Sequence, residues 1–102
     1  MSMFAAVVTH AVMPGILDGD RSALDRANAA WIDYCASRPG FVEFVTLANR
    51  SDRVIAVSLW ESEAAFKATI ADPASQAARA GFAGMFASLT PEFLDVTAYR
   101  RG

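Results

Sequence analysis

His10 is the only histidine of the 102-residue chain, and it stands near the end of an apolar N-terminal run. An imidazole titrates close to neutral pH, so His10 is a candidate general base that takes a proton from a substrate. The alternative is a histidine at the end of a strand that is solvated or bonded to the backbone. The residue type alone does not choose between these two interpretations.

Ser58 and Trp60 lie two residues apart in an apolar segment, and two residues apart in a strand share a face. Trp60 offers a flat surface to an aromatic ligand and an indole N–H to an oxygen atom. Ser58 offers a hydroxyl that can bond to a substrate oxygen. Both have a plain structural alternative, in which Trp60 packs in the core on Phe66 and Ser58 is satisfied by the backbone.

A further group of side chains is apolar or aromatic and is compatible with either a pocket wall or an ordinary core. Trp31 and Tyr34 recur on one stripe of an expected helix, where Tyr34 can also turn its hydroxyl toward a ligand. Cys35 on the same stripe is interpreted as a small buried hydrophobe, because nothing near it in sequence would activate a thiol. The other candidates for substrate contact are Phe44, Phe66, Phe82, Met85 and Phe86.

Four strands are expected to carry most of these residues. Apolar and β-branched residues predict strands over residues 3–13, 41–48 and 53–60, and another over 92–99. Residues 49–52 are rich in turn formers and join the second and third strands into a hairpin. In the first strand His10 therefore shares a face with Val8.

Two helices complete the pattern. Apolar spacings of three and four predict the first over residues 20–38. Ser62 is the predicted N-cap of the second, which restarts at Asp72-Pro73 and runs to about Leu89, before Pro91 ends it. We therefore expect the order β-α-β-β-α-β.

This order is the ferredoxin-like split pattern, an α+β fold in which helices cover one face of an antiparallel sheet. The length predicts a single domain over residues 1–102. Both faces of the third strand are apolar, because Ile55, Val57 and Leu59 alternate with Val54, Ala56 and Trp60. We therefore expect the uncovered face to meet another sheet in a homodimer.

Composition argues against several other classes of protein. The net charge is −2 and no basic run is present, which argues against a nucleic-acid partner. No stretch has the roughly 20 apolar residues of a membrane span. The N-terminus lacks the positive region of a signal peptide, and one cysteine makes no internal disulfide, so a cytoplasmic protein is predicted. Without a cluster of Cys and His, a structural zinc site is not expected.

The central part of the chain resembles a known family. Pro39-Gly40-Phe41 precedes the hairpin, Trp60-Glu61-Ser62-Glu63-Ala64-Ala65-Phe66 closes it, and Asp72-Pro73-Ala74-Ser75-Gln76-Ala77-Ala78 follows. This arrangement resembles the antibiotic biosynthesis monooxygenases, which are dimeric α+β barrels, and the element order matches over residues 3–99. The resemblance implies a homodimer whose sheets pack face to face. It also implies a pocket between the sheet and the helices of each subunit.

The family is functionally mixed, so the resemblance does not choose an activity. Some members are cofactor-free oxygenases that convert anthrone-like phenols to quinones with O₂. For this chain, that chemistry implies His10 as the base. Ser58 and the Trp60 N–H would then hold the developing oxyanion. The expected partners are a small aromatic or hydrophobic molecule and O₂, and no cofactor is expected.

Two other functions stay open at this point. Haem-degrading relatives carry a histidine on the second helix and an asparagine on the first strand. Here those positions hold Ile70 and Val8, which argues against haem. The same alignment implies that His10 points into the pocket or its mouth. The remaining hypotheses are a non-catalytic dimer that binds a small hydrophobic ligand and a polyketide cyclase of the same fold.

Overall fold

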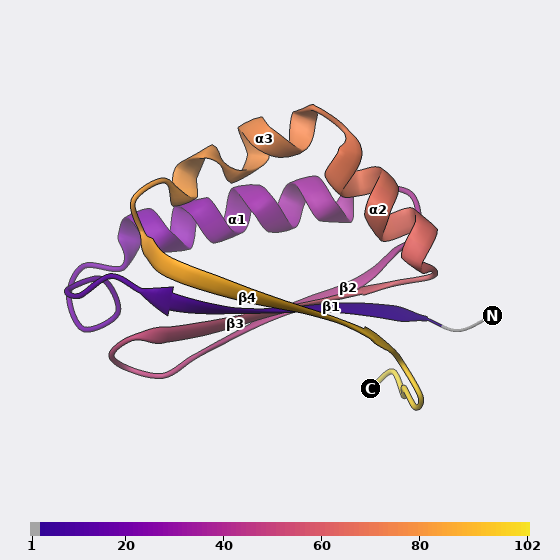
Figure 1. The fold of residues 1–102 in the computed structure, drawn as a ribbon, viewed down its shortest axis with the longest axis horizontal. Coiled ribbons are helices and arrows are strands. Elements are labelled where there is room, and N and C mark those ends of the chain that lie inside the picture. Colours follow the sequence, from indigo (N-terminus) through magenta and orange to yellow (C-terminus); the bar gives the residue numbers. More distant parts are fainter. Residues whose placement is uncertain (1–2) are drawn as a thin grey trace.

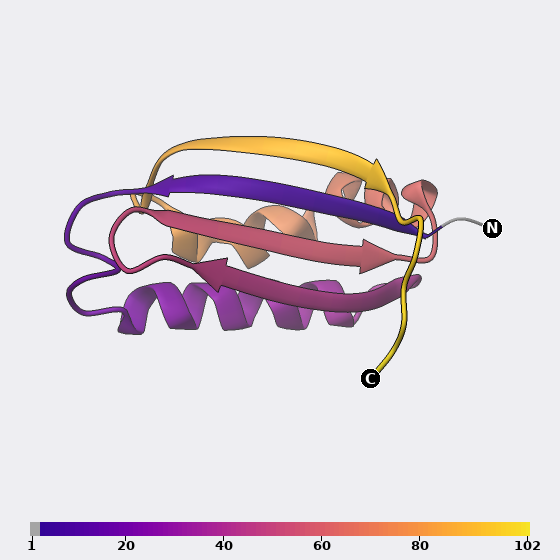
Figure 2. The same cartoon turned by 90° about the horizontal axis from the view of Figure 1, so that it is seen from below.

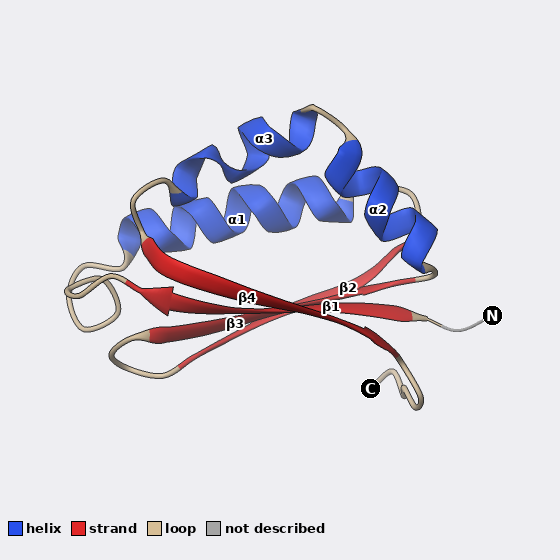
Figure 3. Cartoon of the chain, in the orientation of Figure 1, coloured by secondary structure: helices blue, strands red, loops and turns tan. Residues whose placement is uncertain are grey.

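The computed structural model describes residues 3–102. In chain order the elements are β1 (Phe4–Val12), α1 (Ser22–Ala36), β2 (Phe41–Ala48), β3 (Arg53–Trp60), α2 (Glu63–Ala71), α3 (Ala74–Arg79), the 3₁₀ turn η1 (Ala80–Phe82) and β4 (Phe86–Asp95). The strands form one antiparallel sheet in the order β2-β3-β1-β4. All helices lie on the same face of this sheet (Figures 1 and 3). The predicted ferredoxin-like α+β fold is confirmed.

The pairing register determines which side chains face the helices. β1 lies in the interior of the sheet, where Ala6 is opposite Ser58 and His10 is opposite Val54 on β3. On its other side His10 is opposite Leu89 of β4. Because side chains alternate along a strand, these residues share the helix-covered face. The sheet thus brings His10 and Ser58 to one side.

The second helix begins and breaks where the sequence indicates. The Ser62 side chain accepts a hydrogen bond from the backbone N–H of Ala65 at 3.2 Å, as expected of an N-cap. α2 stops at Ala71 because Asp72 is extended, the conformation favoured before a proline. The Asp72 carboxylate then accepts from the N–H of Ala74 at 2.9 Å, and α3 begins.

The predicted continuation of this helix to Leu89 is wrong. α3 ends at Arg79, and Gly84, with φ +77°, lies in the turn that leads into β4. The strand starts at Phe86 instead of residue 92 and includes Pro91. The apolar residues over 82–89 have a helical spacing, but from Phe86 onward the chain pairs with the whole length of β1 instead. Pro91 is tolerated because β4 is an edge strand, where one side has no ladder to interrupt.

The core is divided into two clusters at opposite ends of the sheet. Phe4, Ala6, Cys35 and Trp60 form one. Val12, Leu17, Leu24 and Val54 form the other. The middle of the sheet, between them, carries the smaller Val8 and Ala56 on its helix-covered face. Side chains of this size leave space between the sheet and the helices.

The opposite face of the sheet carries no helix (Figure 2). It exposes large apolar side chains, among them Val45, Leu47 and Leu94. The C-terminal segment runs across one end of this face (Figure 2), and the Tyr99 hydroxyl donates to Oε1 of Glu43 on β2 at 3.1 Å. Separately, none of the helices within residues 3–102 is long and apolar enough to span a membrane.

Candidate functional site

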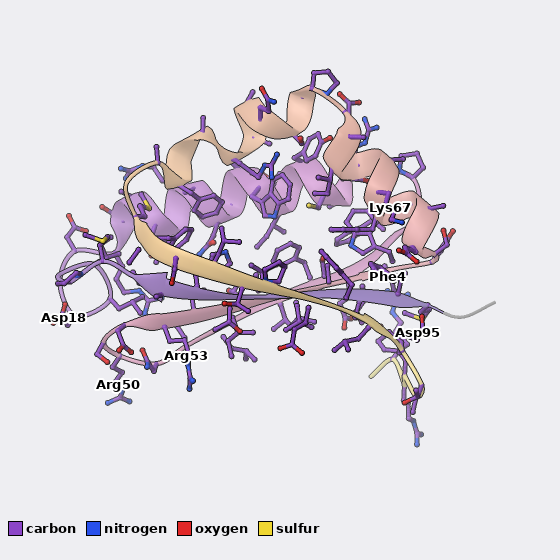
Figure 4. The ribbon with its side chains drawn as sticks, viewed as in Figure 1. Phe4, Asp18, Arg50, Arg53, Lys67 and Asp95 are labelled. Atoms are coloured by element: carbon purple, nitrogen blue, oxygen red, sulfur yellow. The ribbon has the colours of Figure 1, made fainter. Side chains whose placement is uncertain are left out.

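A cavity of about 530 Å³ lies between the middle of the sheet and the helices. Small-molecule sites are typically about 300–1,000 Å³, so its volume suits a compact organic ligand. Side chains from both layers point into the space between sheet and helices (Figure 4). The floor is formed by Ala6, Val8 and His10 of β1, Val54, Ala56 and Ser58 of β3, and Phe44 of β2.

The walls above this floor come from the helices and from β4. α1 contributes Asn28 and Trp31, and α2 contributes Phe66 and Ile70. Arg79 of α3 and Phe82 of η1 lie on the same side of the cavity. β4 closes the remaining side with Phe86, Leu89, Pro91 and Phe93. Leu89 and Phe93 are exposed, so the cavity reaches solvent along this edge strand.

His10 lies in the floor as a neutral imidazole. Its Nδ1 is 3.4 Å from the carbonyl oxygen of Val54, and its ring lies against Phe86 with 4.4 Å between ring centroids. A carbonyl oxygen only accepts, so this contact favours the proton on Nδ1 and leaves the Nε2 lone pair free. Burial lowers the pKa of His10 below its ordinary 6.5, although backbone hydrogen bonding to Val54 and Val8 acts in the opposite direction. At neutral pH the ring is therefore in the form that accepts a proton.

Trp60 lies behind the cavity wall rather than in it. Its side chain is 0% exposed, and its ring packs edge-on against Phe41 and Phe66. The indole N–H donates to Oγ of Ser58 at 2.9 Å. The donor that sequence reasoning assigned to a substrate oxygen is thus occupied by Ser58.

Ser58 faces the cavity and gains its orientation from this hydrogen bond. A hydroxyl has one donor and two acceptor positions, so accepting from Trp60 leaves its own O–H free to donate. Ser58 is opposite Ala6, four residues along β1 from His10. At about 3.3 Å per residue, the backbone positions of the two polar groups are separated by about 13 Å along the strand direction. A ligand that touches both must be extended.

The structure gathers most of the predicted contact residues around the cavity. Trp31, Phe44, Phe66, Phe82 and Phe86 all line it.

Tyr34 and Met85 do not line the cavity. The Tyr34 hydroxyl donates to the carbonyl oxygen of Thr69 at 2.7 Å, which ties α1 to α2. Met85 packs against the cluster around Val12 and Leu24. Cys35 is buried as interpreted, and burial raises the pKa of its thiol to about 12.

Two polar cavity residues, Asn28 and Arg79, were missed by sequence reasoning. The Arg79 guanidinium donates to the carbonyl oxygen and Oγ of Ser75, each at 3.3 Å, and lies 5.5 Å from the centre of the Trp31 ring. Asn28 precedes Trp31 by three residues, so the two share a helix face. That spacing was the available signal for Asn28. Arg79 had none, because its place depends on how α3 packs on α1.

No family model and no curated protein matches the sequence. Solved structures match it over nearly its whole length. SnoaB from Streptomyces nogalater, a cofactor-independent oxygenase, is 18% identical over 99% of this chain and 97% of that chain, with a TM-score of 0.74. A putative antibiotic biosynthesis monooxygenase from Chloroflexus aurantiacus is 20% identical over 98% of both chains, with a TM-score of 0.75.

A monooxygenase from the gene ActVA-Orf6 of Streptomyces coelicolor, solved in complex with Nanaomycin D, is also similar. It is 22% identical over 99% of this chain and 93% of that chain, with a TM-score of 0.73. At these identities the similarity establishes the fold. The expected resemblance to antibiotic biosynthesis monooxygenases is therefore confirmed at the level of the fold.

Proposed function

We propose that this protein is a cytoplasmic, cofactor-independent monooxygenase that oxidises a flat phenolic, anthrone-like substrate of polyketide type to a quinone with O₂. The observation that carries the proposal is the placement of an imidazole, with Nδ1 against the Val54 carbonyl, and an available hydroxyl in the lining of one apolar cavity. The likeness in fold to an oxygenase and a monooxygenase supports the same reaction class.

The proposed reaction begins with removal of a proton from the substrate by Nε2 of His10. The resulting electron-rich anion transfers an electron to O₂, and the two radicals combine at the substrate's methylene carbon to give a peroxide. The second hydrogen leaves that carbon as a proton while the O–O bond breaks, which gives a carbonyl and hydroxide, so one oxygen atom enters the product and the other leaves. The proton held by His10 returns to the departing hydroxide.

The remaining cavity residues assist this chemistry without reacting. The Ser58 hydroxyl donates to the oxygen atom on which charge develops, and Trp60 holds that hydroxyl from behind. Trp31, Phe44 and Phe82 offer flat or apolar surfaces to the rings of the substrate. Apolar walls also keep water from competing for the anion.

The protein is further proposed to work as a homodimer through the face of the sheet that carries no helix. Val45 and Leu47 of β2 are exposed on that face, opposite the half-buried Val57 and Ile55 of β3. Contact between water and such a patch is unfavourable. A second copy of the same sheet, packed on the patch, would exclude the water.

A non-catalytic role in binding a small hydrophobic ligand is the second candidate. It is favoured by the composition of the cavity wall, in which Asn28, Ser58, His10 and Arg79 are the polar members among many apolar ones. Haem is less well served, because Val8 and Ile70 line the cavity without a ligand for iron, which leaves His10, the proposed base, as the only imidazole in the lining.

The test is to add the protein, with chelator present, to a simple anthrone in air-saturated buffer. Oxygen uptake and quinone absorbance are followed together. We expect quinone formation above the uncatalysed rate, with a loss of about 10²- to 10⁴-fold in His10→Ala. Ser58→Ala is expected to lose about 10²-fold. Ser37→Ala is the matched control, because Ser37 is exposed at the end of α1, outside the cavity.

The outcomes separate the candidates. Turnover that survives in His10→Ala keeps the oxygenase and removes the assigned base. Tight binding without turnover of any anthrone supports the ligand-binding role or a cyclase. A Soret shift on titration with haem would contradict the proposed substrate class.

A further inference from the structure

A second hollow of about 270 Å³ lies at the end of the molecule where α2 passes over the N-terminal end of β1. Phe4 of β1 and Lys67 of α2 both lie at this end (Figure 4). Ala71, the last residue of α2, lines this hollow but not the larger cavity. The hollow therefore extends beyond the site described above.

The hollow and the cavity share part of their walls. Phe66, Ile70 and Phe93 line both. The Phe66 ring belongs to a cluster of three aromatic rings, with its centroid 5.5 Å from that of Phe4 and 5.6 Å from that of Phe93, while Phe4 and Phe93 stack at 6.1 Å. Phe93 is 55% exposed, so its side chain has solvent to turn into when its contacts with Phe4 and Phe66 are given up. A ligand group that displaces Phe93 would then pass from the cavity into the hollow.

The chemistry of the hollow favours an aliphatic group without charge. Apart from Glu63 and Lys67 its lining is aromatic or aliphatic. Those two residues lie one helical turn apart on α2 and pair with each other at 3.0 Å, and both side chains are exposed. Their charges offset each other at the rim. A carboxylate buried in the hollow would find no free cation, whereas an alkyl group would lose only its contact with water.

Building on the proposed function, we propose that the substrate is a flat polycyclic phenol with a short neutral alkyl arm. The rings occupy the cavity, and the arm passes Phe93 and occupies the hollow under α2. The arm fixes which end of the rings lies near Ser58 and which near His10, because the hollow opens from the end of the sheet that carries Phe4. The hollow is a specificity subsite and takes no part in the chemistry.

The test compares the dissociation constants of three redox-stable hydroxyanthraquinones by quenching of tryptophan fluorescence. One has no arm, one has a propyl arm, and one has an arm of equal length that ends in a carboxylate. Each methylene that enters the hollow is expected to tighten binding about three- to fourfold. The propyl compound should therefore bind more than tenfold tighter than the parent, and the carboxylate should lose this gain.

Ala71→Leu places a larger side chain in the lining of the hollow, at a position that does not line the cavity. It should remove the preference for the propyl arm and leave the binding of the parent compound unchanged. Ala68→Leu is the matched control on the same helix, since Ala68 is exposed and lines neither space. Circular dichroism verifies that both variants are folded.

Three results would overturn the subsite: no gain from the propyl arm, a gain that persists in Ala71→Leu, or tighter binding of the carboxylate. If the parent compound itself does not bind, the proposed function fails, and the subsite fails with it.

Discussion

Individual side chains in the cavity derive their properties from the groups packed around them. His10 is kept neutral by burial and contacts a backbone carbonyl of the neighbouring strand. Ser58 accepts a hydrogen bond from a tryptophan that no ligand can reach. A substitution at Trp60 should therefore change the site although no ligand touches that residue.

The depressed pKa of His10 predicts a pH dependence of stability. The unfolded chain binds a proton at His10 near pH 6.5, whereas the folded chain does so only at lower pH. Folding thus favours the neutral imidazole. The stability that this preference contributes is lost as the pH falls below 6.5 toward the lower pKa of the folded chain. Between pH 7 and pH 5, the free energy of unfolding measured with urea should fall more for the wild type than for His10→Gln. Parallel profiles for the two proteins would contradict the assigned environment of His10.

The hydrogen bond between Trp60 and Ser58 predicts that the two side chains act as one unit. Trp60→Phe removes the N–H and leaves the hydroxyl free to turn away from the substrate. We expect Trp60→Phe to lower kcat/KM about tenfold, and to lower the free energy of unfolding by about 1–3 kcal/mol. In a double-mutant cycle the combined effect with Ser58→Ala on kcat/KM should be smaller than the sum of the single effects. Additive effects would show that Trp60 is only a core residue.

At the scale of secondary structure, the segment after α3 shows how a local pattern can mislead. Phe82, Phe86 and Leu89 follow a helical spacing, yet β4 begins at Phe86. Pairing of β4 with the whole of β1 outweighs the local helical preference. Without β4, β1 would be an edge strand, and its outer backbone N–H and C=O groups would be left to water. Ser62 and Asp72, in contrast, act on the backbone a few residues away, so their roles were readable from the sequence.

The turn between α1 and β2 provides a prediction at this scale. Gly40 has φ +85°, and a Cβ added there would overlap the Cβ of Ala65 on α2. Gly84 has φ +77° but no neighbour within 4 Å of such a Cβ. Gly84→Ala should therefore cost about 1–2 kcal/mol from backbone strain alone. Gly40→Ala should cost more.

Urea unfolding of both variants measures the difference. Ala65→Gly, combined with Gly40→Ala, should recover the part of the cost that comes from the overlap. Equal losses in Gly40→Ala and Gly84→Ala would mean that α2 does not pack against this turn as described.

At the scale of the whole molecule, one sheet has two faces with different roles. The helix-covered face holds a core cluster at each end and the cavity between them. The other face presents apolar side chains and the crossing C-terminal segment. A homodimer through this second face would leave the cavity accessible along β4.

The proposed dimer can be tested on neighbouring residues of one strand. Leu47, which is 54% exposed, lies on the open face of β2, and Ala48 faces the opposite side. Leu47→Glu should convert the dimer to a monomer in sedimentation equilibrium, because a carboxylate would be buried between the two sheets. Ala48→Glu adds the same charge to the same strand and should leave the dimer intact. A wild-type protein that sediments as a monomer, or a dimer that survives Leu47→Glu, would contradict the interface.

The order of elements, the hairpin and the cap at Ser62 follow from the sequence, because each depends on the local alternation of side chains or on backbone groups a few residues away. The shared face of His10 and Ser58 depends on the register between β1 and β3, which only the structure shows. The tertiary structure decided that the Trp60 N–H meets Ser58 and that Tyr34 turns to Thr69. It also placed Arg79 beside Trp31. These contacts depend on how the helices seat on the sheet. That seating reflects side-chain volumes summed over the whole core, and no local pattern records it.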